Sequence, residues 1–335
     1  MKLRANEVLV NKEHQHLLIA SLQSSEFRRP AGSDRPAVRS MSTELTKNSL
    51  TLATNVLRDR WSIPRQFVGT TAVQHVKRMR GGAQSHLMRC DNGCYYVVKF
   101  RNNPQHERVL ANEFLAARLA ELVGLPVPVA MVVDVPLWLV EHTAELTIML
   151  GNHMIPVEAG LQFGSRYVVS PLEGQVLDYL PREMLDRVRN LEAFAGILAL
   201  DKWTCNADGR QAAFWRKTRE RKYSAAFIDQ GYCFNAGEWT FPDSPLRGVY
   251  PQNEVYACVS GWESFEPWLS RIEKLDEDAI WGLAGEIPPG WYGGSWGELE
   301  ALMQRLIERK AIVRELILGF RESHRHPFPK WMSEA

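Results

Sequence analysis

The chain has 335 residues, 45% of them apolar and 24% charged, which is typical of a globular protein with a buried core. This length is comfortable for two lobes. The formal net charge of +1 excludes a protein-wide field that would attract nucleic acid or an anionic membrane, so an anionic ligand must be held by local charge.

Neither a secretion signal nor a membrane span is predicted. The N-terminus has no continuous apolar core of the kind that a signal peptide needs. Residues 122–140 are apolar apart from Asp134, but Pro126, Pro128 and Pro136 would break a membrane helix there. The five cysteines are odd in number and form no C-x-x-C pair, which favours a reducing compartment and no zinc site. We therefore expect a cytoplasmic protein without a membrane or nucleic-acid partner.

Four segments are predicted along the chain. Residues 1–65 are polar with little periodicity, which indicates a flexible N-terminal extension. Residues 66–170 carry most of the predicted strands, residues 171–325 are mostly helical, and residues 326–335 form a tail. A β-rich segment followed by a helical one predicts an α+β fold with two lobes and a cleft between them.

Apolar periodicity and turn residues define the secondary structure that we expect. In the first half the predicted elements are strands at Val73–Met79, His86–Cys90 and Cys94–Phe100, a helix at Pro104–Val123, and strands within Val127–Val140 and at Arg166–Ser170. In the second half they are a helix at Arg182–Leu200, strands at Gln211–Trp215 and Tyr223–Asp229, and amphipathic helices after Glu263, the clearer at Glu298–Phe320. An Asn-Gly pair predicts a hairpin turn at 92–93, and Gly124 is the expected end of the first helix.

A loop of small residues lies between the first two predicted strands. Gly81 and Gly82 would let backbone N–H groups approach a phosphate closely, and Ser85 would add a hydroxyl. No Gly-Lys-Ser/Thr follows, so the loop is not a Walker A motif. An ordinary hairpin turn stays open as the alternative.

A lysine and a glutamate form the next candidate pair. Lys99 ends a strand rich in aromatic and β-branched residues, where a lysine is costly to bury unless it is paired. Glu113 is its natural partner, because the helix positions three and four residues away are small or apolar. A lysine held by a carboxylate can contact ATP phosphates. The alternatives are an edge-strand lysine that discourages aggregation and a glutamate that faces water.

Three polar residues in the second half have the order of a metal–nucleotide site. Asp201 and Asn206 lie in a predicted loop after a long helix, and Asp229 ends a strand in the sequence Asp-Gln-Gly. Mg²⁺ prefers oxygen ligands and is commonly held by one or two carboxylates plus substrate phosphates. A loop aspartate can orient an incoming hydroxyl while an asparagine and a second aspartate hold the metal. Taken singly, Asp201 could be a helix cap and Asp229 a turn residue.

Read in order, these residues resemble the HipA-like kinases, bacterial relatives of the phosphoinositide-kinase branch of the protein-kinase-like fold. The segments NEFLAARLA at 112–120 and NADGRQ at 206–211 are similar to family patterns, and the resemblance covers about residues 70–320. It implies a two-lobed protein-kinase-like fold with a β-rich N-lobe and a helical C-lobe, which uses ATP and Mg²⁺.

The resemblance also implies roles for individual residues. Lys99 would contact the ATP phosphates, Asp201 would be the catalytic aspartate, and Asn206 and Asp229 would bind the metal. The stretch 167–173 would be the hinge beside the adenine, and its candidate contacts are Tyr167, Val168 and Glu173.

The activity implied is transfer of a phosphoryl group from ATP to a hydroxyl, with a protein Ser/Thr acceptor favoured by analogy. There are two departures from the family. Trp203 stands where the catalytic loop often carries a His, and residues 1–65 do not resemble the N-terminal subdomain of toxin-type members. A non-catalytic relative that binds a nucleotide or a partner stays open, as does a small-molecule or lipid kinase.

Overall fold

The computed structural model describes residues 69–331. The predicted N-terminal extension at 1–65 and the end of the predicted tail lie outside the described residues. All described residues belong to one compact unit, Arg65–Ala335. Within residues 69–331 no helix is both long and apolar enough to cross a membrane.

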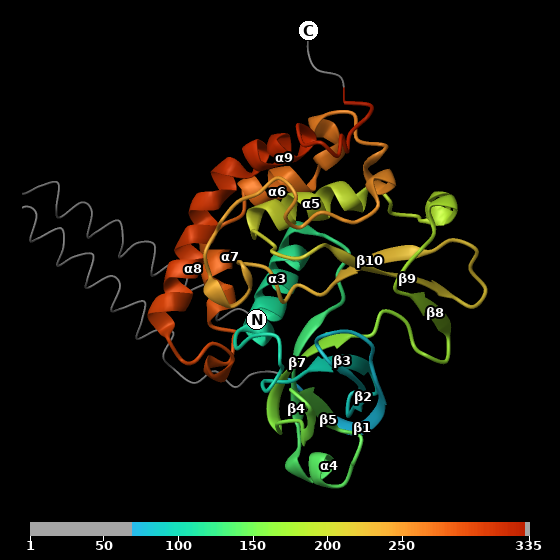
Figure 1. The fold of residues 1–335 in the computed structure, drawn as a ribbon, viewed down its shortest axis with the longest axis vertical. Coiled ribbons are helices and arrows are strands. Elements are labelled where there is room, and N and C mark those ends of the chain that lie inside the picture. The colour runs from blue at the N-terminus through green and yellow to red at the C-terminus, as the bar shows by residue number, and fades with distance from the viewer. Residues whose placement is uncertain (1–68, 332–335) are drawn as a thin grey trace, which may run out of the picture. The chain divides into compact units, whose positions relative to one another are not determined.

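Strands and helices alternate in the first part of this unit, and helices dominate the last part (Figure 1). The strands are β1 Thr70–Arg78, β2 His86–Cys90, β3 Tyr95–Lys99, β4 Ala130–Val135, β5 Thr147–Leu150, β6 His153–Pro156, β7 Gly160–Arg166, β8 Gly174–Leu177, β9 Gln211–Lys217 and β10 Ser224–Ile228. The α-helices are α3 Val109–Val123, α4 Leu137–Glu141, α5 Ala193–Trp203, α6 Trp268–Glu273, α7 Glu277–Ala284, α8 Trp296–Arg309 and α9 Val313–Arg321. Short 3₁₀ helices lie at Arg182–Arg187, Ala236–Glu238, Asn253–Tyr256, Trp262–Phe265, Pro289–Trp291 and Lys310–Ile312.

Five strands close into a barrel in the order β1-β2-β3-β7-β4. Neighbouring strands are antiparallel except β1 and β4, whose parallel pairing closes the barrel. Tyr96 and Val98 alternate with less buried residues along β3 and pack in the barrel interior with Met88 of β2 and Val133 of β4. The predicted Asn-Gly turn joins β2 to β3, with Gly93 at φ +77°.

Helix α3 packs between the barrel and the helices that follow. It contacts β4 and β7 on one side and α6 and α7 on the other, so almost all of its side chains are buried. Gly124 ends the helix in the left-handed conformation at φ +79°, as predicted. The helix begins at Val109 and not at Pro104, because the Asn103 side chain accepts the Gln105 N–H in a turn before it.

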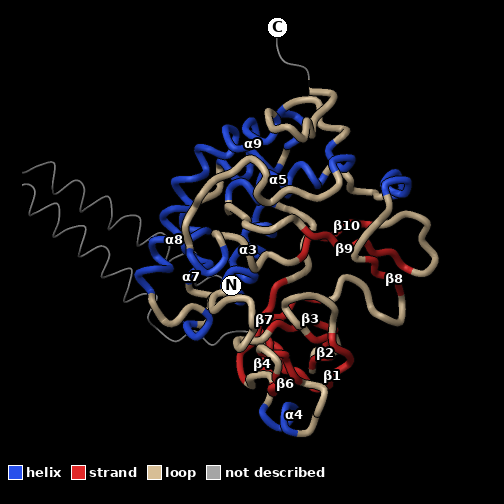
Figure 2. The backbone as a smooth tube through the Cα atoms, in the orientation of Figure 1, coloured by secondary structure: helices blue, strands red, loops and turns tan. Residues whose placement is uncertain are grey.

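A second sheet has the order β10-β9-β8 and lies apart from the barrel (Figure 2). Its buried face and the helices α5, α6, α8 and α9 share a hydrophobic core separate from that of the barrel. Strands β9 and β10 agree with the prediction to within a few residues, whereas the four-residue strand β8 was not predicted.

The loop predicted to begin at Asp201 is wrong. Helix α5 continues through Asp201 to Trp203, and every side chain from Ala193 to Trp203 is buried. The Trp203 indole donates to the carbonyl of Leu306 at 2.8 Å, which ties the end of α5 to α8. The helix is longer at this end because its buried charges are satisfied there: Arg210 binds Asp201, and Lys202 Nζ donates to the carbonyls of Pro245 and Arg247.

Four other predicted elements differ from the structure. The helix predicted at Arg182–Leu200 begins only at Ala193, and Arg182–Arg187 is a separate 3₁₀ helix. The apolar stretch at 127–140 is strand β4 followed by the short helix α4, which Pro136 precedes. The strand predicted at Arg166–Ser170 is wrong, since β7 ends where that segment begins. The helix predicted at Glu298–Phe320 is interrupted by a 3₁₀ turn at Lys310–Ile312, where the lysine Nζ donates to the carbonyl of Leu275.

A buried histidine on β2 makes the barrel sensitive to acid. His86 has no exposed surface, and its ring lies 3.0 Å from a ring nitrogen of His75 and 3.2 Å from the carbonyl oxygen of Thr147. Burial, together with His75, lowers the pKa of His86 to about 4. The unfolded chain therefore binds a proton that the folded protein rejects between about pH 6.5 and pH 4, so stability falls on acidification.

We expect the free energy of unfolding to depend less on pH in His86→Gln than in the unmodified protein between pH 7 and pH 4.5. Urea denaturation at several pH values measures both slopes. His153→Gln is the matched control, because His153 is exposed on β6. Equal slopes in the His86 variant and the unmodified protein would show that His86 does not carry the effect.

Candidate active site

A pocket of about 1040 Å³ opens between the barrel and the β8–β10 sheet. The barrel contributes residues of β1, β3 and β7 and the glycine loop that follows β1. The opposite side is formed by residues 208, 210–213, 228–229 and 250–252. The lining carries both lysine and arginine side chains and carboxylates, so the pocket suits a ligand with its own charges and a bound cation.

A buried ion-paired triad forms one wall of this pocket. Lys99, the last residue of β3, binds Glu113 of α3 and donates to Oδ1 of Asp229 at 2.7 Å. The lysine is 7% exposed and the glutamate 2% exposed. Glu113 Oε1 also accepts the backbone N–H of Gly231 at 2.8 Å. The structure therefore brings together three of the residues singled out in the sequence.

The charges of the triad depend on one another. Burial opposes the charge of Lys99, but the carboxylates of Glu113 and Asp229 outweigh burial and raise its pKa. Burial raises the pKa of Glu113, and Lys99 only partly offsets this. Burial also acts to raise the pKa of Asp229, but Lys99 outweighs burial and the pKa of Asp229 is lowered. Asp229 and Lys99 are thus a charged pair at the pocket, backed by a more deeply buried carboxyl group.

The backbone turns sharply at Asp229. The residue follows directly after β10 and has φ +63°, a left-handed conformation that costs a non-glycine residue roughly 1–2 kcal/mol. The turn is held by Gln230, whose side-chain amide donates to the carbonyl of Phe227 at 3.1 Å. A further contact comes from Gln211, whose Nε2 donates to Asp229 Oδ2 at 2.8 Å. The Asp229 side chain, 23% exposed, is thereby fixed at the pocket surface.

Asn112 holds the segment that follows Asp229 against α3. Its side-chain nitrogen donates to the carbonyls of Gly231, Cys233 and Ala236 at 2.8–2.9 Å. Its side-chain oxygen accepts the indole N–H of Trp239 at 2.8 Å. Asn112 and Glu113 are adjacent in the sequence, so one turn of α3 fixes both the lysine and this segment.

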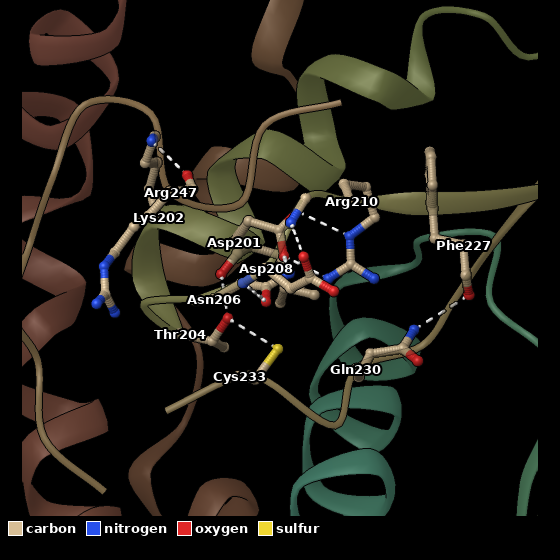
Figure 3. A network of polar contacts seen from close by, with 12 residues as sticks. Asp201, Lys202, Thr204, Asn206, Asp208, Arg210, Phe227, Gln230, Cys233 and Arg247 are labelled. Carbon is tan, nitrogen blue, oxygen red and sulfur yellow. Dashed lines mark hydrogen bonds and ion pairs between the residues drawn. The ribbon is translucent and has the colours of Figure 1, made fainter. Parts of the chain in front are cut away.

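Asp201 and Asn206 are not in the pocket lining. Asp201 has no exposed surface, and its carboxylate accepts hydrogen bonds from Arg210 and from Asn206 Nδ2 (Figure 3). Asn206 is 1% exposed, and its side-chain oxygen accepts the N–H of Asp208 at 3.1 Å. Both side chains are fully engaged inside the protein, which leaves neither free to meet a ligand.

Asp208 and Gln211 line the pocket instead, and sequence reasoning missed both. Asp208 is exposed, and Gln211 begins β9 beside Asp229. A signal was present, because Asp208 and Gly209 form a turn pair immediately before a strand, and such residues are exposed more often than the last turn of an apolar helix. Asp208 Oδ1 accepts the N–H of Gly209 at 2.7 Å, as expected for such a turn.

The predicted glycine loop lies over the pocket. Gly81, at φ +119°, Gly82 and Ser85 all belong to the lining. The loop is closed by the Met79 N–H, which donates to the Ser85 carbonyl at 2.8 Å, and the Asn103 side chain donates to the carbonyl of Ala83 at 2.8 Å. The same part of the lining carries three cations that were not predicted, Lys77, Arg78 and Arg80.

The predicted hinge contributes in part. Tyr167 and Val168 line the pocket just after β7. Glu173 is exposed outside the lining, and its carbonyl accepts the N–H of Thr218. The structure thus places the first two of these residues at the pocket and the third away from it.

The oxygen atoms at the pocket fit Mg²⁺ that arrives with a phosphate ligand. Asp208 and Asp229 are carboxylates in the lining, and the side-chain amide of Gln211 lies beside Asp229. In residues 69–331 no group of three or more His, Cys, Asp or Glu side chains is arranged to hold a metal alone. Mg²⁺ does not need such a group, because it commonly takes one or two protein carboxylates and completes its shell with phosphate and water.

Comparison with known proteins identifies a relationship for the central part of the chain. Residues 73–223 match the family model of the HipA-like kinases, which confirms the resemblance predicted from the sequence. A search of curated proteins finds no match.

Several solved structures are similar at low identity. The Helicobacter pylori proinflammatory kinase CtkA is 15% identical with a TM-score of 0.49, over 74% of this chain and 94% of that one. The Golgi casein kinase is 14% identical with a TM-score of 0.47, over 80% and 76% of the two chains. HipA of Shewanella oneidensis, solved with HipB and operator DNA, is 11% identical with a TM-score of 0.39, over 75% and 69%.

Proposed function

We propose that this protein is an ATP- and Mg²⁺-dependent phosphotransferase with a two-lobed protein-kinase-like fold. The observation that supports it most is the Lys99–Glu113–Asp229 triad at the wall of a large pocket roofed by a glycine loop. The match to HipA-like kinases over residues 73–223 includes the glycine loop, Lys99 and Glu113. In this proposal the barrel with α3 is the N-lobe, and the β8–β10 sheet with the later helices is the C-lobe.

The phosphate end of ATP would lie between the glycine loop and the triad. Backbone N–H groups of Gly81 and Gly82 and the Lys99 ammonium would contact the phosphates, because Lys99 is charged and held in place by its two carboxylates. Tyr167 and Val168 would lie beside the adenine. Mg²⁺, when bound, offsets negative charge on the phosphates.

The metal and the acceptor would be held on the β8–β10 side of the pocket, where the Asp229 end of the triad lies. Asp229 and Gln211 would bind Mg²⁺, since their side chains are already in contact and both line the pocket. Asp208 would accept a hydrogen bond from the acceptor hydroxyl and take its proton as the new O–P bond forms and the bond from the γ-phosphorus to the β–γ bridging oxygen breaks, which releases ADP. We assign this role to Asp208 in place of Asp201, and metal binding to Gln211 in place of Asn206, because the latter two are enclosed in the protein.

A hydroxyl of a protein Ser or Thr is the acceptor we propose, on the analogy with the family. A small-molecule or lipid hydroxyl would use the same groups, since fold does not determine the acceptor. Trp203, which left room for a non-catalytic relative, is a core residue at the end of α5 and lies outside the pocket lining. If Asp208 is the aspartate that meets the acceptor, Arg210 stands two residues later, at the position where the family's catalytic loop often carries a His.

Labelled ATP tests the proposal. We expect transfer of the γ-phosphoryl label to the protein itself or to an acceptor in a proteome extract in the presence of Mg²⁺, and loss of transfer with a chelator or in Asp229→Asn. Asp186→Asn, a change of an exposed carboxylate on a 3₁₀ helix, is the matched control and should retain transfer. Nucleotide binding without turnover on protein, lipid and metabolite acceptors would establish the non-catalytic alternative.

A further inference from the structure

The segment Asn206–Arg210 is an arch whose two ends bind one buried carboxylate. At the first end, Asn206 Nδ2 donates to Asp201 Oδ1 at 3.0 Å, and its backbone N–H donates to the Asp201 carbonyl at 3.0 Å. At the other end, Arg210 Nε donates to Asp201 Oδ2 at 2.8 Å, and its Nη2 donates to Oδ1. Asp208 is the middle residue of the arch, is labelled among the polar residues of Figure 3, and is exposed in the pocket lining.

The same guanidinium connects the arch to the metal-binding side of the pocket. Arg210 Nη1 donates to the carbonyl of Ile228 at 2.9 Å, and Ile228 directly precedes Asp229. The backbone N–H of Arg210 donates to the carbonyl of Val249 at 3.1 Å. A shift of Arg210 would therefore move the supports of Asp208 and Asp229 together.

Close packing behind Asp201 prevents the carboxylate from retreating. Gly248 has φ +68°, and a Cβ built there would lie 2.5 Å from Asp201 Cβ and 3.3 Å from Asn206 Cβ. Both members of the Asp201–Arg210 ion pair are fully buried. A buried ion pair is seldom a net gain in stability over apolar residues of similar volume, whereas it does fix geometry.

We propose that Asp201 is a positioning residue, whose buried carboxylate holds both ends of the arch through Asn206 and Arg210 and so fixes the place of Asp208 in the pocket lining. This inference rests on the proposed function for its kinetic consequence, but its structural consequence can be measured without turnover. It gives the buried aspartate a role in the rate of phosphoryl transfer without contact to ATP, metal or acceptor.

Asp201→Asn tests this role, because the amide keeps the size of the side chain but cannot accept from Arg210 with both atoms. We expect kcat to fall about 10- to 100-fold, as for a displacement of reacting groups of order 1 Å, while KM for ATP changes less than about threefold. In an Asp208→Asn background the same change should cost less than it costs alone, since part of its effect passes through Asp208.

The chain offers a matched control in a second bidentate pair. Arg309 binds Asp243 through two hydrogen bonds of 2.6 and 2.8 Å near the same end of α5 but outside the pocket lining. Asp243→Asn should lower stability and leave kcat unchanged. The proposal would be overturned if Asp201→Asn kept the full kcat. It would also be overturned if the fold-losses of kcat in Asp201→Asn and Asp208→Asn multiplied in the double variant.

Hydrogen exchange measured by mass spectrometry separates this inference from the proposed function. Asp201→Asn should speed amide exchange in the peptide covering 206–211, and Asp243→Asn should not. If the unmodified protein transfers no phosphoryl group, the proposed function is wrong. Faster exchange in Asp201→Asn would still support the role of Asp201 in holding the arch. Unchanged exchange in that peptide in Asp201→Asn would overturn this role of Asp201, whatever the activity of the protein.

Discussion

Replacing Asp208 by Asn is expected to lower kcat for phosphoryl transfer by about 10²- to 10⁴-fold, with little change in KM for ATP. The asparagine keeps the size of the side chain and its position at the pocket but cannot take a proton from the acceptor hydroxyl. ATP contacts the glycine loop and Lys99 in our proposal, so its binding does not depend on Asp208. Single-turnover transfer of labelled phosphate, with ATP affinity measured separately, checks both parts.

The same experiment decides between Asp208 and Asp201 as the group that meets the acceptor. If the group were Asp201, Asp208→Asn would act like a change at an exposed turn and leave kcat near that of Asp186→Asn. In our assignment Asp208→Asn costs more than Asp201→Asn, because the first removes the proton acceptor and the second only displaces it. The reverse order would return the role to Asp201.

The sequence could identify Lys99, Glu113 and Asp229 because each has a local signal that its surroundings do not override. Lys99 ends a short apolar strand, Glu113 stands among small residues of a helix, and Asp229 precedes a glycine at the end of a strand. A charged group in such apolar surroundings must find a partner when it is buried. The structure brings these three into contact across 130 positions of the chain.

The place of Asp201 could not be predicted, because it depends on where α5 ends. Apolar periodicity indicates that a helix exists but locates its last turn poorly, so the sequence predicts a loop from residue 201. What keeps them helical is tertiary: Trp203 packs on α8, and the Asp201 charge is met by Arg210, nine positions later. The spacing of Asp201 and Asn206 suggested a metal site, whereas the two side chains bind each other.

Short strands were missed for a related reason. The four-residue strands β5, β6 and β8 are too brief for an alternating pattern to stand out. Strand β8 matters for the site, because Val176 on it lines the pocket. Its existence depends on pairing with β9, a contact between segments about forty positions apart that no local signal reveals.

Lys99→Met is expected to affect both rate and stability. The variant loses the cation at the phosphates, and removal of such a preorganised charge commonly costs about 10²- to 10³-fold in kcat. It also leaves the fully buried Glu113 without its cation, and breaking a buried pair from one side costs about 3–5 kcal/mol. Urea denaturation at pH 7 and labelled-ATP transfer measure the two effects independently.

The pH dependence of the variant follows from the remaining carboxyl groups. Burial already raises the pKa of Glu113, and loss of Lys99 raises that pKa further. A carboxyl whose folded pKa lies above its unfolded value binds more protons in the folded state, so the variant should be least stable above pH 7 and recover part of the loss as the pH falls towards 5. For Glu113 in the unmodified protein this recovery should be smaller, because Lys99 partly offsets the effect of burial on its pKa.

A second substitution separates structure from chemistry at the triad. Lys99→Met with Glu113→Gln removes the uncompensated charge, and the amide can still accept the N–H of Gly231. We expect this double variant to regain most of the stability lost in Lys99→Met, to lose the pH dependence, and to remain inactive. Restored transfer in the double variant would mean that Lys99 serves only to neutralise Glu113. The phosphate-binding role would then have to pass to another cation of the lining, and Arg78 or Arg80 beside the glycine loop would be the first to examine.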